Sequence, residues 1–143
     1  MVMSRMIINY SFLKRCILKT RIHVTAWLNE PQNVIYNFAT EALFENGKLH
    51  YFDHTHKRQD VIYSLSSVEI KRKADISTWL YFSLKEDSFC YIKSAFGIMK
   101  LAVNLIRWQL EDDYMELIYQ IELADKHYEK RGLCWQIEKK IVH

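Results

Sequence analysis

Apolar and polar residues alternate with a period of two along most of the chain, and the pattern is clearest in residues 36–54. This stretch holds Asn46-Gly47 between two alternating runs. Gly adopts positive φ without steric cost and Asn tolerates it, so the dipeptide predicts a β-hairpin with a type I′ turn. Before the turn, one face carries mostly apolar side chains that a core can bury: Val34, Tyr36, Phe38, Thr40, Ala42 and Phe44.

The same alternation predicts further strands, separated by short polar or Pro-containing turns. The expected strands are residues 21–29, 61–65, 68–73, 79–84, 89–94 and 133–143. Arg131-Gly132 is expected to form a turn before the last of them. Each segment is short and half apolar, which is typical of an antiparallel sheet with one face in a core.

Two segments in the last third of the chain fit a helix as well as a strand. In residues 99–110 and 114–126, apolar side chains recur both at every second position and at helical spacing. The second segment is also rich in good helix formers. If every segment is a strand, the chain has about eight to ten of them, which is the pattern of an antiparallel barrel or sandwich.

Charge divides the 143 residues into two parts. The first 29 residues contain five basic residues and no acidic one, whereas the remainder has 15 basic and 17 acidic residues, a net charge of −2. We therefore expect a basic N-terminal extension over residues 1–20, helical or disordered, followed by one domain over residues 21–143. The near-neutral domain makes strong binding to nucleic acid unexpected.

The three cysteines are far apart and form no Cys-x-x-Cys pair, which indicates free thiols in a reducing compartment. No apolar run reaches the roughly 18 residues that a membrane span needs. The N-terminal apolar run is short and lacks a cleavage site for a secretory signal. These features predict a cytoplasmic protein, monomeric or homodimeric.

Four stretches follow one another in a characteristic order. They are Phe-Glu-Asn-Gly-Lys-Leu-His-Tyr-Phe-Asp at 44–53, Val-Glu-Ile-Lys-Arg at 68–72, Tyr-Ile-Lys-Ser with Phe-Gly at 91–97, and Leu-Ile-Tyr-Gln-Ile at 117–121. Their succession resembles the YwiB-like family, a domain of unknown function in low-GC bacteria. The resemblance covers residue 21 to the C-terminus.

Members of that family are calycin-type, lipocalin-like β-barrels, so the resemblance implies an all-β, antiparallel up-and-down barrel. It also implies that both ambiguous segments are strands. The sequence departs from the family pattern at Lys73-Ala74, where a Gly is usual, and at Asp53, where a Glu is usual. The family has no established activity, so the resemblance implies no catalytic residue.

The first candidate for a functional residue is Arg72. Its parity with Val68 and Ile70 predicts an inward side chain, and an unpaired buried guanidinium costs several kcal/mol. It would therefore bind an anionic ligand, pair with Asp53 or Asp75, or keep its head in water at the rim. Aromatic side chains on the expected inner faces, namely Tyr36, Phe38, Tyr91 and Tyr119, would complete a ligand site.

Other groups of residues give weaker evidence for a functional site. His50, His54 and His56 share parity, but two of them fall in an expected loop, so exposed histidines are the simpler interpretation and no metal or other cofactor is expected. No nucleophile elbow or Gly-rich phosphate loop occurs, and the acidic pairs fall at expected hairpin tips. The sequence therefore gives no positive evidence for an enzyme.

Two hypotheses follow. The first is a non-catalytic barrel that binds a small amphipathic or anionic molecule in its interior, with polar contacts from Arg72 and the tyrosines and an apolar wall from Tyr36 and Phe38. The alternative is an interaction module that binds a protein or an RNA through its outer face or its basic N-terminal segment.

Overall fold

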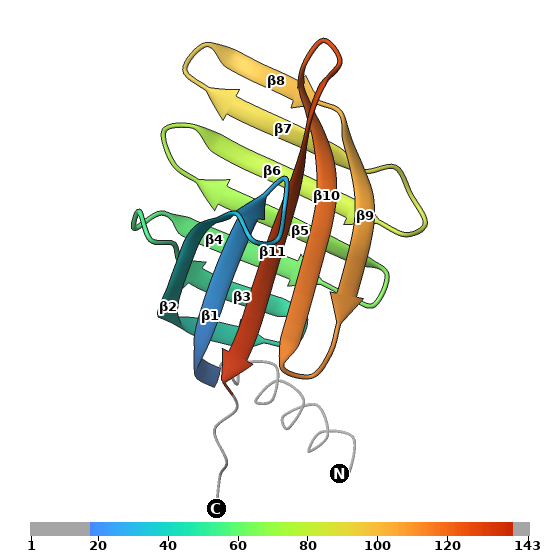
Figure 1. Ribbon diagram of the computed structural model, residues 1–143. Coiled ribbons are helices and arrows are strands. Elements are labelled where there is room, and N and C mark those ends of the chain that lie inside the picture. Colours follow the sequence, from blue (N-terminus) through green and yellow to red (C-terminus); the bar gives the residue numbers. More distant parts are fainter. Residues whose placement is uncertain (1–17, 139–143) are drawn as a thin grey trace, which may run out of the picture.

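The structure, a computed structural model, describes residues 18–138, and eleven strands make up the described chain (Figure 1). The strands are β1 (Leu18–Leu28), β2 (Val34–Glu45), β3 (Lys48–Phe52), β4 (Arg58–Tyr63), β5 (Ser67–Lys73), β6 (Ser77–Ser83), β7 (Phe89–Ser94), β8 (Gly97–Leu101), β9 (Val103–Leu110), β10 (Tyr114–Ala124) and β11 (His127–Glu138). Among residues 18–138, no helix is long and apolar enough to cross a membrane. Residues 1–17, which hold Cys16 and most of the expected basic extension, and residues 139–143 lie outside the described chain.

Every strand pairs antiparallel with its neighbours, in the order β8-β7-β6-β5-β4-β3-β2-β1-β11-β10-β9. The first and last strands pair with each other, so the sheet curls into a barrel that is closed except between β8 and β9. Figure 1 shows two layers, with β2, β1, β11, β10 and β9 in front and β3 to β8 crossing behind them at a large angle. The predicted all-β, antiparallel up-and-down barrel is confirmed.

Several expected details were wrong. There are eleven strands rather than eight to ten, partly because the segment 99–110 is interrupted at Ala102 and forms both β8 and β9. The segment 114–126 is a strand, as the resemblance implied, but it ends at Ala124 because Lys126 turns the chain with φ 58°. The first strand starts at Leu18, inside the expected extension.

The Asn46-Gly47 hairpin forms between β2 and β3, as predicted. The turn type differs, since Gly47 has φ 76° whereas Asn46 is not among the described residues with positive φ. Positive φ at the second central residue alone is the pattern of a type II turn. The expected I′ geometry is therefore wrong, although Gly47 is needed in either case.

Gly132 is not in a turn but in the middle of β11, directly opposite Trp27 of β1. A Cβ at this position would lie 2.0 Å from Cε2 of the Trp27 indole, which is only 8% exposed. The glycine is thus required because the indole packs directly against its backbone. The prediction of a turn at Arg131-Gly132 was wrong because a glycine inside a strand can mark close packing as well as a bend.

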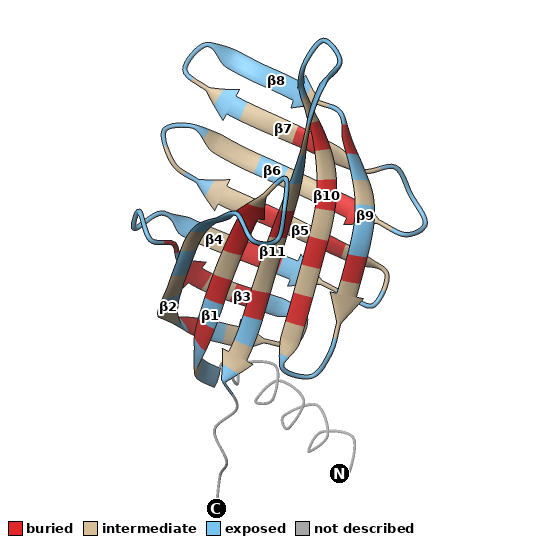
Figure 2. Cartoon of the chain, viewed as in Figure 1, coloured by how far each residue is buried: buried red, intermediate tan, exposed pale blue. Residues whose placement is uncertain are grey.

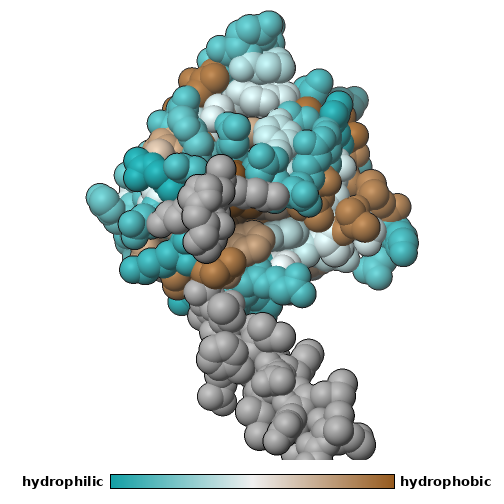
Figure 3. Space-filling view, turned by 90° about the horizontal axis from the view of Figure 1, so that it is seen from below, coloured by the Kyte–Doolittle hydropathy of each residue, from teal (hydrophilic) through white to brown (hydrophobic). Residues whose placement is uncertain are grey.

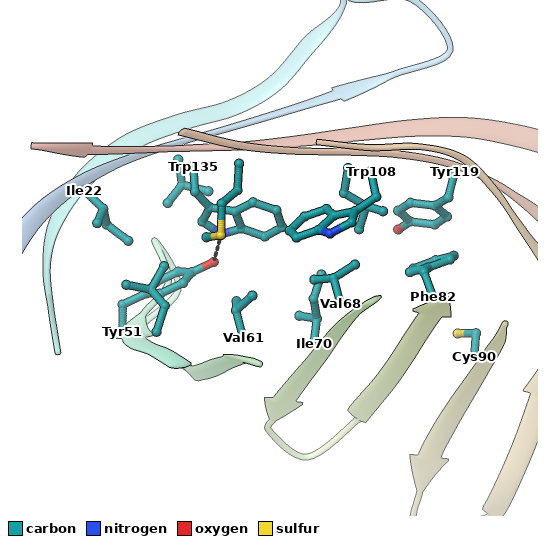
Figure 4. Packing of buried hydrophobic residues seen from close by; sticks show 14 of the residues in the cluster. Ile22, Tyr51, Val61, Val68, Ile70, Phe82, Cys90, Trp108, Tyr119 and Trp135 are labelled. Atoms are coloured by element: carbon teal, nitrogen blue, oxygen red, sulfur yellow. Dashed lines mark hydrogen bonds between the residues drawn. The ribbon is translucent and has the colours of Figure 1, made fainter. Parts of the chain in front are cut away.

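The centre of the barrel is filled by side chains. Buried residues gather on β1, β10, β11 and the middle of the rear layer, whereas β8 is mostly exposed (Figure 2). Trp135, Trp108 and Tyr119 of the front layer face Tyr51, Val61, Val68, Ile70 and Phe82 of the rear layer (Figure 4). The middle of the barrel is therefore occupied by packed side chains.

Two hydrogen bonds from buried indoles join the layers. Trp135 donates from Nε1 to the Tyr51 hydroxyl over 2.9 Å, the bond drawn in Figure 4. Trp108 donates from Nε1 to the Ser64 carbonyl over 2.8 Å, which ties β9 to the β4–β5 connection where the barrel is not closed by strand pairing. In the view from below, hydrophilic side chains cover most of the visible described surface, with separate hydrophobic patches between them (Figure 3).

The barrel has a second gap beside β2. This strand pairs with β1 along nearly its whole length, but only Ala42 to Glu45 pair with β3. The first half of β2, which carries Tyr36 and Phe38, therefore lacks a strand partner on its other side among the described residues. The turns from β3 to β4 and from β5 to β6 lie on the same side of the molecule, at the left in Figure 1.

Candidate functional site

A hollow of about 430 Å³ opens beside the unpaired half of β2, between the inner faces of the two layers. Its lining includes Tyr36 of β2, Arg72 of β5 and Tyr119 of β10, three of the five predicted ligand-binding residues. These residues are distant in sequence, and only the curling of the sheet brings them together. We call this hollow the mouth cavity.

Asp53, in the turn between β3 and β4, binds two residues that line the mouth cavity, Gln59 and Arg72. Its carboxylate accepts five hydrogen bonds, from the backbone N–H groups of Thr55 and Lys57 and from the side chains of Thr55, Gln59 and Arg72. Burial alone would raise the pKa of Asp53, but these hydrogen bonds outweigh burial and hold the pKa well below its usual range. The carboxylate is therefore charged and fixes the turn.

Arg72 forms an ion pair with Asp53, which is one of the three arrangements expected from the sequence. Its Nε lies 2.9 Å from Asp53 Oδ2, and Nη2 donates to Thr55 Oγ1 over 3.2 Å. The side chain is 30% exposed, which places it at the rim of the barrel. A guanidinium has five N–H donors, and these bonds use two, so Arg72 retains donors for a ligand.

A second arginine faces the mouth cavity from β11. Arg131 donates from Nε and Nη2 to Glu129 Oε1, over 3.1 and 2.9 Å, and both residues line the cavity. Arg131 also lies directly across the β10–β11 ladder from Tyr119. The lining thus contains two arginines, each paired with a carboxylate, so their charges are balanced locally.

The tyrosine hydroxyls of the mouth cavity are hydrogen-bond donors at neutral pH. Burial raises the pKa of Tyr36 to about 12, with smaller contributions from Tyr119 and Asp53. Burial also raises the pKa of Tyr119, although the neighbouring Arg131 opposes the rise. Protonated phenols with a raised pKa are poor general bases, so they suit binding better than proton abstraction.

Aromatic rings form the wall beside these polar groups. The ring of Tyr36 stacks on His54 of the β3–β4 turn, with centroids 4.4 Å apart and an interplanar angle of 28°. Phe38 lies 5.8 Å from Tyr36 and 5.5 Å from His54. Tyr36, Phe38 and His54 therefore form one aromatic cluster, of which Tyr36 lines the mouth cavity whereas Phe38 and His54 do not.

Phe38 lies beside the mouth cavity without lining it, and Tyr91 lies on the opposite face of the sheet. On β7 it is Cys90 and Ile92 that pack into the core, so Tyr91 and Phe89 face outward beside Trp79. The expectation that Tyr91 points inward was wrong, because both faces of β7 are apolar and parity alone does not select one. Together with Trp79 and Phe89, Tyr91 lines a groove of about 630 Å³ on the outer face of the barrel.

His50, His54 and His56 have different surroundings and do not form a cluster. Nδ1 of His50 lies 2.7 Å from Asp60 Oδ1 on the outer face, while His54 stacks on Tyr36 at the mouth. His56 turns the chain with φ 62°. Within residues 18–138, no group of three or more His, Cys, Asp or Glu side chains is placed to hold a metal ion.

Three further residues line the mouth cavity that the sequence pattern did not predict: Arg131, Glu129 and Gln59. A usable signal was present for Arg131, since its parity with Leu133 and Trp135 places it on the inner face once β11 is continuous. The turn assigned to Arg131-Gly132 concealed that parity. Gln59 lay in an expected loop but is the second residue of β4.

Comparison with known proteins gives one informative result. No family model matches the chain, and no curated protein matches its sequence. The crystal structure of the ywiB protein from Bacillus subtilis matches with a TM-score of 0.59, covering 91% of this chain and 99% of that chain. The chain has the YwiB fold. At 14% sequence identity the likeness concerns the fold alone. It confirms the resemblance predicted from the four sequence stretches.

Proposed function

We propose that the protein is a non-catalytic binder of a small amphipathic molecule with an anionic head group, held in the mouth cavity of the YwiB fold. The observation that carries this proposal is the convergence of Tyr36, Arg72, Tyr119 and Arg131 from four strands on one hollow. Its volume of about 430 Å³ falls within the usual range for ligand sites in proteins.

The chemistry of the lining favours this class of ligand. Two guanidinium groups with unused donors suit a carboxylate or a sulfonate, and the tyrosine hydroxyls add neutral donors. Each guanidinium already has a carboxylate partner, so a multiply charged ligand would gain little. Because the packed core blocks the middle of the barrel, the apolar part of the ligand would lie against Tyr36 and Phe38 near the opening.

We also propose that the protein acts in a bacterial cytoplasm. The described cysteines, Cys90 and Cys134, are free thiols, as expected in a reducing compartment. The alternative of an interaction module has one supporting observation, the aromatic and basic groove that Tyr91 lines on the outer face.

The proposal can be tested with 8-anilinonaphthalene-1-sulfonate, an amphipathic anion whose fluorescence rises in apolar sites. Arg131→Gln should weaken its binding about tenfold or more, because a hydrogen bond to a charged group is lost. Arg107→Gln is the matched control, since Arg107 pairs with Glu116 on an exposed part of β9 and β10. Tyr119→Phe should weaken binding less. Tyr63→Phe is its control, since Tyr63 packs beside Phe44 and does not line the mouth cavity.

Equal affinity of the Arg131 and Arg107 variants would refute binding in the mouth cavity. Loss of binding in Trp79→Ala, with Arg131→Gln unaffected, would show that the probe binds in the outer groove and would also refute the proposal.

A further inference from the structure

The outer face of β5 to β8 carries an ordered row of side chains that the mouth cavity does not use. The strand registers place Lys71 opposite Trp79, Trp79 opposite Tyr91, and Tyr91 opposite Lys100. Two aromatic residues therefore lie side by side between two lysines. With neighbouring strands about 4.8 Å apart, the backbone positions of the lysines are separated by about 14 Å.

The aromatic residues of the row are supported from one side. Phe89 meets Trp79 edge to face, with centroids 4.9 Å apart, and stacks on Tyr81 at 5.2 Å. Trp79 nevertheless remains 40% exposed. The row thus presents a firm aromatic surface that nothing in the described chain covers fully.

The charges beside this surface are positive. The groove of about 630 Å³ is lined by four basic residues and by no acidic one: Lys71, Arg72, Lys73 and Lys93. Glu69 contacts Lys71 over 3.2 Å but lies outside the lining. Because the domain is near neutral overall, this local excess is balanced by acidic residues elsewhere, and net charge alone did not reveal it.

The lysines at the two ends of the row lie over the rings. Lys71 Nζ is 5.2 Å from the Trp79 ring, and Lys100 Nζ is 5.8 Å from the Tyr91 ring. At exposed sites such cation–π contacts are weak, so a flat ligand group can displace the flexible ammonium groups. The released lysines could then contact anionic groups that flank the stacked ligand.

We propose that this groove binds single-stranded nucleic acid, with bases stacked on Trp79 and Tyr91 and phosphates contacted by the surrounding lysines. Aromatic platforms framed by basic side chains are the usual means of binding single strands without sequence preference, because every base has a π face. An acidic peptide would match the lysines but has no flat group in each unit for the aromatic row. Arg72, which is paired with Asp53, lines both the groove and the mouth cavity. The aromatic row and the lysines line only the groove, so either proposal can fail alone.

Tryptophan fluorescence provides a direct assay. The chain has four tryptophans, and the three others, Trp27, Trp108 and Trp135, are at most 9% exposed. A short oligouridylate or oligothymidylate that stacks in the groove should therefore quench Trp79 selectively. Trp79→Phe should abolish the quenching while the oligonucleotide still binds, as measured by the anisotropy of a fluorescein label.

Two variants test the stacking and the charge separately. Trp79→Ala should weaken binding about 5- to 150-fold, the range for loss of one stacked base. Phe52→Ala is its matched control, since Phe52 is 60% exposed on another part of the outer face. The pair Lys73→Ala/Lys93→Ala should reduce the steepness of the salt dependence by about 1.4 in log–log slope. Lys57→Ala/Lys126→Ala removes the same charge from two other turns.

Several outcomes would overturn the proposal. One is the absence of anisotropy change and quenching at low salt. Another is equal binding by the groove variants and their controls, which would place the nucleic-acid site elsewhere, for example in the basic N-terminal segment. Competition by polyglutamate as effective as by the oligonucleotides would indicate an acidic protein partner instead. Circular dichroism and unfolding midpoints would show whether each variant remains folded.

Discussion

Replacement of Gly132 by alanine should destabilise the protein although it adds one methyl group. The Cβ would lie 2.0 Å from Cε2 and 2.1 Å from Nε1 of Trp27, far inside contact distance. The indole is 8% exposed, and both residues line the mouth cavity, so the clash also concerns the candidate site. Neither backbone nor ring can yield without loss of packing.

Two limits bound the loss in free energy of unfolding. If Trp27 only shifts, the loss is that of an overpacked core, about 1–3 kcal/mol. If the ring is expelled, about 150–250 Å² of buried aromatic surface is lost, which at about 25 cal/mol per Å² amounts to about 4–6 kcal/mol. We expect about 2–4 kcal/mol, because a partial displacement lies between these limits.

A double-mutant cycle isolates the cause. Trp27→Ala alone should cost about 3–5 kcal/mol. In that background Gly132→Ala should be neutral or stabilising by about 0.5 kcal/mol, since the clash is gone and the unfolded chain loses freedom. The free energy of unfolding of the natural protein, the two single variants and the double variant is measured by urea denaturation. Comparable m-values would show that only stability has changed. A cost below about 0.5 kcal/mol for Gly132→Ala alone, or the same cost in both backgrounds, would refute the packing argument.

Two further predictions concern buried hydrogen bonds. The lowered pKa of Asp53 means that its charged form stabilises the fold above the unfolded carboxyl pKa of about 3.9 and that this contribution is lost as the pH falls. Asp53→Asn should therefore lower the free energy of unfolding by about 2 kcal/mol at neutral pH. It should also make the free energy of unfolding, measured in urea, fall less steeply below about pH 4. An equally steep fall in the variant would contradict this prediction. Tyr51→Phe should cost about 1–3 kcal/mol because the Trp135 N–H loses its partner, and an unchanged unfolding free energy would contradict that.

The alternation of apolar residues predicted most of the strands and most of their inner faces, whereas the strands in residues 99–110 and 114–126 were implied only by the resemblance. Tyr36, Tyr51, Phe82, Tyr119 and Trp135 all belong to the core or pack against it, as their parity indicated. A sequence with one apolar face per strand must bury those faces together, in a barrel or in a sandwich. The up-and-down order then followed from short connections and from the resemblance.

The errors arose where parity carried no information. Both faces of β7 are apolar, so the outward direction of Tyr91 depends on the aromatic neighbours Trp79 and Phe89, which only the strand register reveals. The mouth cavity depends on the unequal pairing of β2, which no local pattern encodes. Glycine at 132 resembled a turn because its partner, Trp27, is more than a hundred residues away in the chain.

The central claim is that the mouth cavity holds a small amphipathic ligand, and native mass spectrometry of protein purified from its own host tests it most directly. We predict a bound small molecule in the natural protein and in Arg107→Gln, with strongly reduced occupancy in Arg131→Gln. Recovery of only the unliganded mass from all three proteins, or equal occupancy in both arginine variants, would contradict the claim.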